Sequence, residues 1–95
     1  MDITFKSIIG KHILIGITYL NKQGEITKMI QFDGDIIDVK ENVGIIIKKR
    51  KSNEEFKLPL DLSFIKLAQP GEYKLKSTGE IIIDPDLIST LIIEQ

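Results

Sequence analysis

The chain has 95 residues, 0 cysteines, and 13 basic against 14 acidic residues, for a net charge of −1. This length is typical of one domain, which we place over residues 1–95. Without cysteine, a disulfide framework, a thiolate metal site and a cysteine nucleophile are excluded. The balanced charge speaks against a general polyanion binder, which normally carries a clear basic excess.

The N-terminal segment Met1–Lys6 has no basic stretch followed by an apolar one, so we expect no signal peptide. The longest apolar runs, such as Val43–Ile47, are far too short to cross a bilayer. Together with the absence of cysteine, these features predict a cytoplasmic protein without membrane attachment.

Residues 11–20 alternate in a way that predicts a strand, with Ile13, Ile15, Ile17 and Tyr19 on the apolar face and His12 on the opposite one. The turn at Asn21–Gly24 follows, where Gly24 can take a positive φ. We therefore expect the strand to bury the isoleucines and to leave His12 exposed or half-buried.

Residues 25–40 read as a long second strand whose inward positions change parity. Ile26, Ile30 and Phe32 share one parity, while Ile37 and Val39 share the other. Such a change requires an inserted residue or a sharp bend, and glycine inside a strand often marks one. We favour a bent strand at Asp33-Gly34-Asp35. The alternative is a tight hairpin at Asp33-Gly34, which would leave very short arms.

The second half of the chain alternates short apolar segments with turn signals. Gly79 suits a left-handed position in a hairpin loop, and Asp84-Pro85-Asp86 resembles a helix start. The expected elements are strands over 43–51 and 55–60, a helical turn near 61–63, a hairpin over 72–83, a helical turn from 84 to 89 and a last strand over 90–94.

This pattern predicts an all-β fold, a small SH3-like or Sm-like barrel of five to seven short antiparallel strands with one or two helical turns. Closure into a barrel would hide the edges of strands so rich in isoleucine.

Two family resemblances accompany this pattern. The chain resembles a family of short, uncharacterised bacterial proteins. The residues that carry this likeness are Leu58-Pro59, Asp61-Leu62-Ser63, Ala68, Pro70-Gly71-Glu72-Tyr73, Leu75, Ser77-Thr78-Gly79-Glu80, Pro85-Asp86, Gly10-Lys11 and Ile15–Tyr19. It implies a bacterial source and no established activity, and it assigns no site residues.

The second resemblance is to Sm-like and other SH3-like small barrels, through Gly10–Ile13 at the start of a strand, Gly24 in a turn and Gly34 within a bent strand. The RNA-binding signatures of that family are not recognisable. Only Glu41-Asn42 stands where an asparagine loop would be, and no Arg-Gly pair follows it. The resemblance therefore implies architecture more than function.

Two segments are the candidate binding residues: the basic run Lys48, Lys49, Arg50 and Lys51, and the hairpin loop with Ser77, Thr78 and Glu80. The basic run could contact phosphates, but adjacent strand residues point to opposite faces, and we favour a solvated hairpin tip as its explanation. Loop tips often carry binding residues, although turn chemistry also accounts for the hydroxyls.

Catalytic and metal chemistry have little support in the sequence. His12 is the one histidine and has no evident nucleophile beside it, so no catalytic residue is assigned. Asp33 with Asp35, and Asp84 with Asp86, read as turn, bulge or cap residues rather than metal ligands. No metal and no cofactor is expected.

These observations favour a non-enzymatic accessory module that contacts a protein partner, or a second copy of itself, through a loop or a sheet edge. The alternatives are a Sm-like RNA-binding barrel and, less favoured, a small enzyme.

Overall fold

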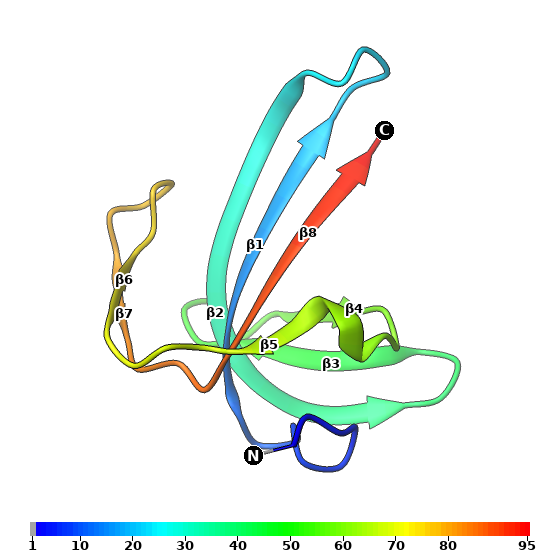
Figure 1. Cartoon of the computed structure of the whole chain (residues 1–95), viewed down its shortest axis with the longest axis vertical. Coiled ribbons are helices and arrows are strands. Elements are labelled where there is room, and N and C mark those ends of the chain that lie inside the picture. The colour runs from blue at the N-terminus through cyan, green and yellow to red at the C-terminus, as the bar shows by residue number, and fades with distance from the viewer. Residues whose placement is uncertain (1) are drawn as a thin grey trace.

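The computed structural model describes residues 2–95, and within them it is built almost entirely of strands (Figure 1). Its elements are β1 (His12–Leu20), β2 (Ile26–Lys40), β3 (Gly44–Lys49), β4 (Glu55–Leu58), the 3₁₀ helix η1 (Leu62–Phe64), β5 (Ile65–Leu67), β6 (Glu72–Lys74), β7 (Ile81–Ile83) and β8 (Leu87–Glu94). The expected all-β class is confirmed, with more strands than the five to seven expected.

Six strands form one sheet in the order β4-β3-β2-β1-β8-β5, and β6 pairs with β7 in a separate hairpin. The sheet is open, since β4 and β5 are its two edges, so it does not close into a barrel. The expectation of antiparallel strands throughout is wrong in one place, because β1 and β8 run parallel. The first and last strands are thus neighbours inside the sheet, with β1 at its centre and β8 next to the edge strand β5.

The main core lies on one face of this curved sheet. Ile13, Ile15 and Ile17 of β1 are buried there, as their alternation predicts, together with Leu87 and Leu91 of β8. Cross-strand neighbours on one face pack against one another, which fixes the register of β1 between β2 and β8. Ile8, Ile36, Ile45, Ile47, Leu58 and Ile65 complete this cluster.

β2 is one continuous bent strand, as the favoured reading predicts, and not a hairpin. The inserted residue, however, falls three positions beyond Gly34. The ladder with β3 shifts register between Ile36 and Asp38. Ile36 is therefore fully buried while Ile37 is 44% exposed, so the inward assignment of Ile37 is wrong. A bulge moves the side chains that follow it to the other face.

β1, β8 and the first half of β2 project beyond the rest of the molecule as a three-stranded arm (Figure 1). β3 pairs with β2 only from Gly34 onward, and β5 pairs with β8 only up to Ser89. Both outer edges of the arm are therefore unpaired within residues 2–95.

The β6–β7 hairpin covers the face of the sheet opposite the main core. Leu75 and Ile82 pack there against Leu14 in a second buried cluster, with Tyr73 and Ile88 at its border. The expected hairpin is confirmed, including Gly79 at a φ of 75°. Leu14 is buried although it lies on the outward parity of β1, because this hairpin covers it.

The expected helical turn from Asp84 to Ser89 is wrong, because β8 begins at Leu87. Asp84 has a φ of 46°, and its carboxylate accepts a 2.7 Å hydrogen bond from the Gly71 amide across the base of the hairpin. Leu87 and Ser89 are buried between β1 and β5, so tertiary pairing overrides the local helix signal.

No helix within residues 2–95 has the length and hydropathy needed to cross a membrane.

Candidate functional site

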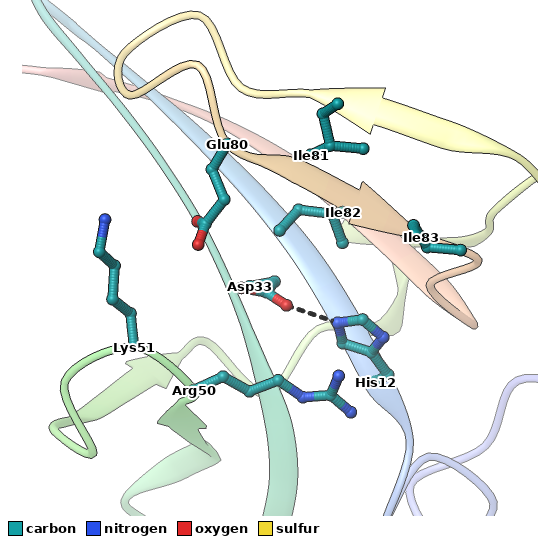
Figure 2. Close-up of a pocket in the computed structure, with 8 residues that line it drawn as sticks. All are labelled: His12, Asp33, Arg50, Lys51, Glu80, Ile81, Ile82 and Ile83. Carbon is teal, nitrogen blue, oxygen red and sulfur yellow. Dashed lines mark hydrogen bonds and ion pairs between the residues drawn. The ribbon is translucent and has the colours of Figure 1, made fainter.

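A pocket of about 380 Å³ lies between the β6–β7 hairpin and the outer face of the main sheet (Figure 2). It collects residues from four separate segments of the chain. They are His12 of β1, Asp33 of β2, Arg50 and Lys51 of the β3–β4 turn, Glu80 of the hairpin loop, and Ile81, Ile82 and Ile83 of β7.

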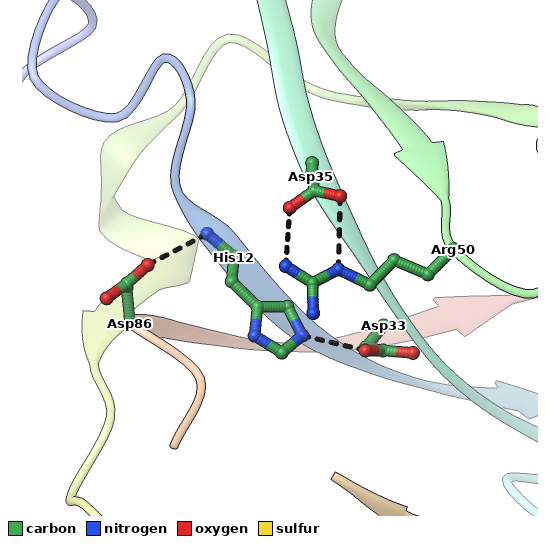
Figure 3. Close-up of polar contacts among 5 residues, drawn as sticks. All are labelled: His12, Asp33, Asp35, Arg50 and Asp86. Carbon is green, nitrogen blue, oxygen red and sulfur yellow. Dashed lines mark hydrogen bonds and ion pairs between the residues drawn. The ribbon is translucent and has the colours of Figure 1, made fainter. Parts of the chain in front are cut away.

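Asp33 and His12 form the floor of this pocket. They lie on neighbouring strands, and the His12 Nε2 atom is 2.7 Å from Asp33 Oδ2 (Figures 2 and 3). Because an ionised carboxylate can only accept, Nε2 carries the proton of this hydrogen bond. Only 9% of the Asp33 side chain and 11% of the His12 side chain are exposed. The pair thus places a nearly buried carboxylate at the bottom of an open pocket.

Arg50 forms one wall and is held in place by Asp35. Its Nε and Nη2 atoms donate to the two Asp35 oxygens at 3.1 and 2.8 Å (Figure 3). This bidentate hydrogen bonding lowers the pKa of Asp35 and raises that of Arg50, and partial burial opposes both shifts only in part. The charge of Arg50 is therefore largely balanced by a carboxylate outside the pocket lining.

A second aspartate fixes the start of β1 near the site. The His12 amide donates to Asp86 Oδ2 at 3.0 Å, and the Asp86 amide donates to the His12 carbonyl at 2.9 Å (Figure 3). This two-way bonding holds the His12 backbone, so the imidazole leaves β1 from a fixed position.

The backbone of β7 turns an unpaired edge toward the pocket. The Leu75 amide donates to Glu80 O and the Asp84 amide to Gly71 O, both at 2.8 Å. In an antiparallel pair, hydrogen-bonded positions alternate with positions whose amide and carbonyl point away from the partner. With this register, the groups of Ile82 point to β6, whereas those of Ile81 and Ile83 point outward. Figure 2 shows β7 as the hairpin strand nearer to Asp33 and His12.

The structure divides the residues singled out from the sequence. Arg50, Lys51 and Glu80 line the pocket. Lys48 and Lys49 belong to β3 and point to opposite faces, with Lys49 Nζ 4.6 Å from the centre of the Phe32 ring. The basic run therefore forms no single patch. Ser77 and Thr78 are exposed at the hairpin tip and do not line the pocket.

Sequence reasoning treated His12 and Asp33 separately and missed their pairing. Both lie on the outward parity of their strands, which was a usable signal. The register that joins them, with Leu14 opposite Asp33, depends on the turn between β1 and β2. The β7 edge was not foreseen, because nothing local indicates which side of a hairpin remains open.

The groups in the pocket can bind a ligand by charge and by hydrogen bonds. It combines two carboxylates, a histidine, two cationic side chains and an unpaired strand edge. No Ser or Thr among residues 2–95 lines it beside His12. Over the same residues, no three His, Asp or Glu side chains are grouped so that they could hold a metal ion.

Comparisons with protein-family models, with curated proteins and with solved structures give no match to this chain.

Proposed function

We propose that the protein is a non-enzymatic binding module that captures an extended segment of a partner protein by adding it as a strand to β7. The observation that carries this proposal is the outward orientation of the Ile81 and Ile83 amides and carbonyls. Strand addition of this kind derives affinity from main-chain hydrogen bonds and specificity from side-chain pockets.

The surroundings of β7 supply that specificity. An added strand lies between the hairpin and the wall formed by Arg50 and Lys51, in the pocket that Asp33 and Glu80 also line. The unpaired edges of β2 and β8 on the arm are longer, but no residue of β8 lines this pocket. β2 reaches the pocket only at Asp33, whose carbonyl already accepts from the Arg50 amide at 3.2 Å. The β7 edge is thus the one where backbone pairing and side-chain recognition coincide.

The test uses proline, which removes a backbone donor. Extended peptides are selected from a randomised display library on the whole chain, and their affinity is then measured for Ile81→Pro and Ile83→Pro. Because these amides do not bond to β6, proline is compatible with the hairpin, as it is at other strand edges. We expect each variant to lose about tenfold or more in affinity.

Ile81→Thr and Ile83→Thr are the matched controls, since they remove the same exposed side chains but keep the amide. They should bind within about threefold of the original protein, a difference of under 1 kcal/mol. Failure of the library to yield any binder, or equal binding by the proline variants, rejects the proposal.

The alternative function is RNA binding by a Sm-like small barrel. The bent β2 and the basic run are its support. The division of Lys48 and Lys49 between two faces, the pairing of Arg50 with Asp35 and the net charge of −1 weaken that support. Contact with about four phosphates requires a log–log salt slope near −3 for single strands.

A further inference from the structure

We infer that the captured segment carries a lysine or arginine at the residue that lies opposite Ile82. This inference rests on the proposed function and adds the chemical class of the partner. It follows from the direction of the side chains around β7 and from the balance of charge in the pocket.

The geometry decides where that residue points. In an antiparallel or parallel pair, directly opposed residues send their side chains to the same face. Ile82 is 5% exposed and packs against Leu14 of β1. The cross-strand partner of Leu14 on β2 is Asp33. A side chain opposite Ile82 is therefore directed at the floor of the pocket, next to Asp33.

Two carboxylates, those of Asp33 and Glu80, lie at that position. Asp33 Oδ2 accepts from His12, whereas Oδ1 accepts no hydrogen bond from residues 2–95. Glu80 is opposite the inward-facing Leu75 and so shares the face of Ile82, and its carboxylate points into the pocket toward Asp33 (Figure 2). It has no ion pair among the described residues.

The cationic groups offset these charges only in part. His12 is bonded to one Asp33 oxygen, and Arg50 lies near enough for its charge to act on Asp33 without forming an ion pair with it. Arg50 is engaged with both oxygens of Asp35. Lys51 is exposed at the rim and forms no ion pair among the described residues. A nearly buried carboxylate is stabilised most by a cationic group that donates hydrogen bonds to it. It is destabilised most when an apolar group replaces its bound water, because its hydrogen bonds are then lost. The long side chain of lysine or arginine reaches that depth from an edge strand.

The experiment compares three acetylated, amidated peptides of alternating threonine and valine whose central residue is lysine, norleucine or glutamate. Affinity is measured by fluorescence anisotropy on the whole chain, and the Ile81 and Ile83 amide resonances report where each peptide binds. We expect the lysine peptide to bind about tenfold more tightly than the other two at low salt, and the preference to shrink as salt is raised.

The charge variants test the cause of this preference. Glu80→Gln and Asp33→Asn should each reduce the lysine preference to about threefold or less. Asparagine can still accept the His12 bond at position 33. Glu80 lies in the hairpin loop outside the strands, so Glu80→Gln is expected to fold even where Asp33→Asn does not. Glu72→Gln is the matched control, because it removes the same charge from the outer face of β6 and should leave the preference unchanged.

The outcomes separate the two proposals. If all three peptides shift the Ile81 and Ile83 resonances with equal affinity, or the glutamate peptide binds best, the lysine or arginine inference is wrong and strand capture stands. If none of the peptides binds, and the display selection also yields nothing, both are wrong.

Discussion

Gly34 occupies a place where β2 passes too close to β3 for any side chain. A Cβ built on it would lie 2.5 Å from the Lys48 carbonyl oxygen and 2.7 Å from Cγ2 of Ile47. Both neighbours belong to the backbone or the packed core, so neither can move away without disturbing the ladder. The glycine is thus needed for the close approach of β2 to β3.

We predict that Gly34→Ala lowers the free energy of unfolding by about 1–3 kcal/mol, the usual cost of overpacking. Gly16→Ala is the control, since Gly16 is also in a strand but a Cβ there meets nothing within 4 Å. That change should be neutral or stabilise by up to about 1 kcal/mol, because alanine restricts the unfolded chain. Urea denaturation of both variants measures the difference, and equal effects would contradict the packing argument.

Asp35 links stability to pH through Arg50. Its pKa is lowered chiefly by the hydrogen bond from Arg50 and by the nearby positive charge. A carboxylate with a lowered folded-state pKa contributes stability that is complete above the ordinary aspartate pKa of about 4. That stability is lost as pH falls through the lower folded-state pKa. Both partners are more than 40% exposed, so solvent screening keeps the contribution at about 1 kcal/mol or less.

We predict that Asp35→Asn removes this part of the acid sensitivity. Between pH 7 and pH 3, the original protein should lose up to about 1 kcal/mol more unfolding free energy than the variant. Glu41→Gln, in the exposed β2–β3 turn and without an ion pair, should behave like the original protein. A variant as sensitive to acid as the original protein would show that the Arg50 pair contributes nothing.

At the level of elements, the hairpin is held by far less apolar contact than the strands of the main core. Its buried cluster consists of Leu14, Leu75 and Ile82. One hydrogen bond, from the Lys76 amide to Gln31 Oε1 at 2.6 Å, holds its tip against β2. Segments with few buried contacts open at lower free energy than the global transition. The β7 edge therefore sits on the part of the fold that detaches most easily.

We predict that Ile82→Ala speeds hydrogen exchange at the Leu75 and Asp84 amides, which donate within and below the hairpin, by about tenfold or more. The global unfolding free energy should change by less than the ~2–5 kcal/mol that truncation of a core isoleucine usually costs. Ile83→Ala, on the exposed face of the same strand, should leave exchange unchanged. If Ile82→Ala lowers the global unfolding free energy by the full ~2–5 kcal/mol, the hairpin and the sheet unfold together.

Several individual elements could be predicted from the sequence. The alternation of β1, the continuity of β2 and the Gly79 hairpin loop follow from local patterns. The segment from Asp84 to Ser89 could not be read this way. Asp84 and Pro85 are typical of a helix start. However, the Asp84 carboxylate accepts from the Gly71 amide, and the residues from Leu87 onward pair with β1 and β5.

For the whole molecule, periodicity indicated the class of fold but not the order of strands. The alternation of isoleucines shows which face of a strand is buried, but it does not indicate which other strand pairs with that strand. Closure into a barrel was expected in order to hide edges. The sheet instead ends in two very short edge strands, β4 and β5, and leaves the β2 and β8 edges of the arm unpaired within residues 2–95. The pocket follows from that order, since it needs β1, β2 and the hairpin together.

The parallel pairing of β1 with β8 also shapes how the chain must fold. His12 and Asp86, which bond to each other where the two strands begin, are 74 positions apart. Closing so long a loop costs entropy before any contact repays it, and such topologies fold slowly. During synthesis β1 can pair with β2 early, but its other side must remain open until the last strand leaves the ribosome. A permuted chain that begins with β8 and reaches β1 through a crossover linker, which parallel strands require, would shorten this wait.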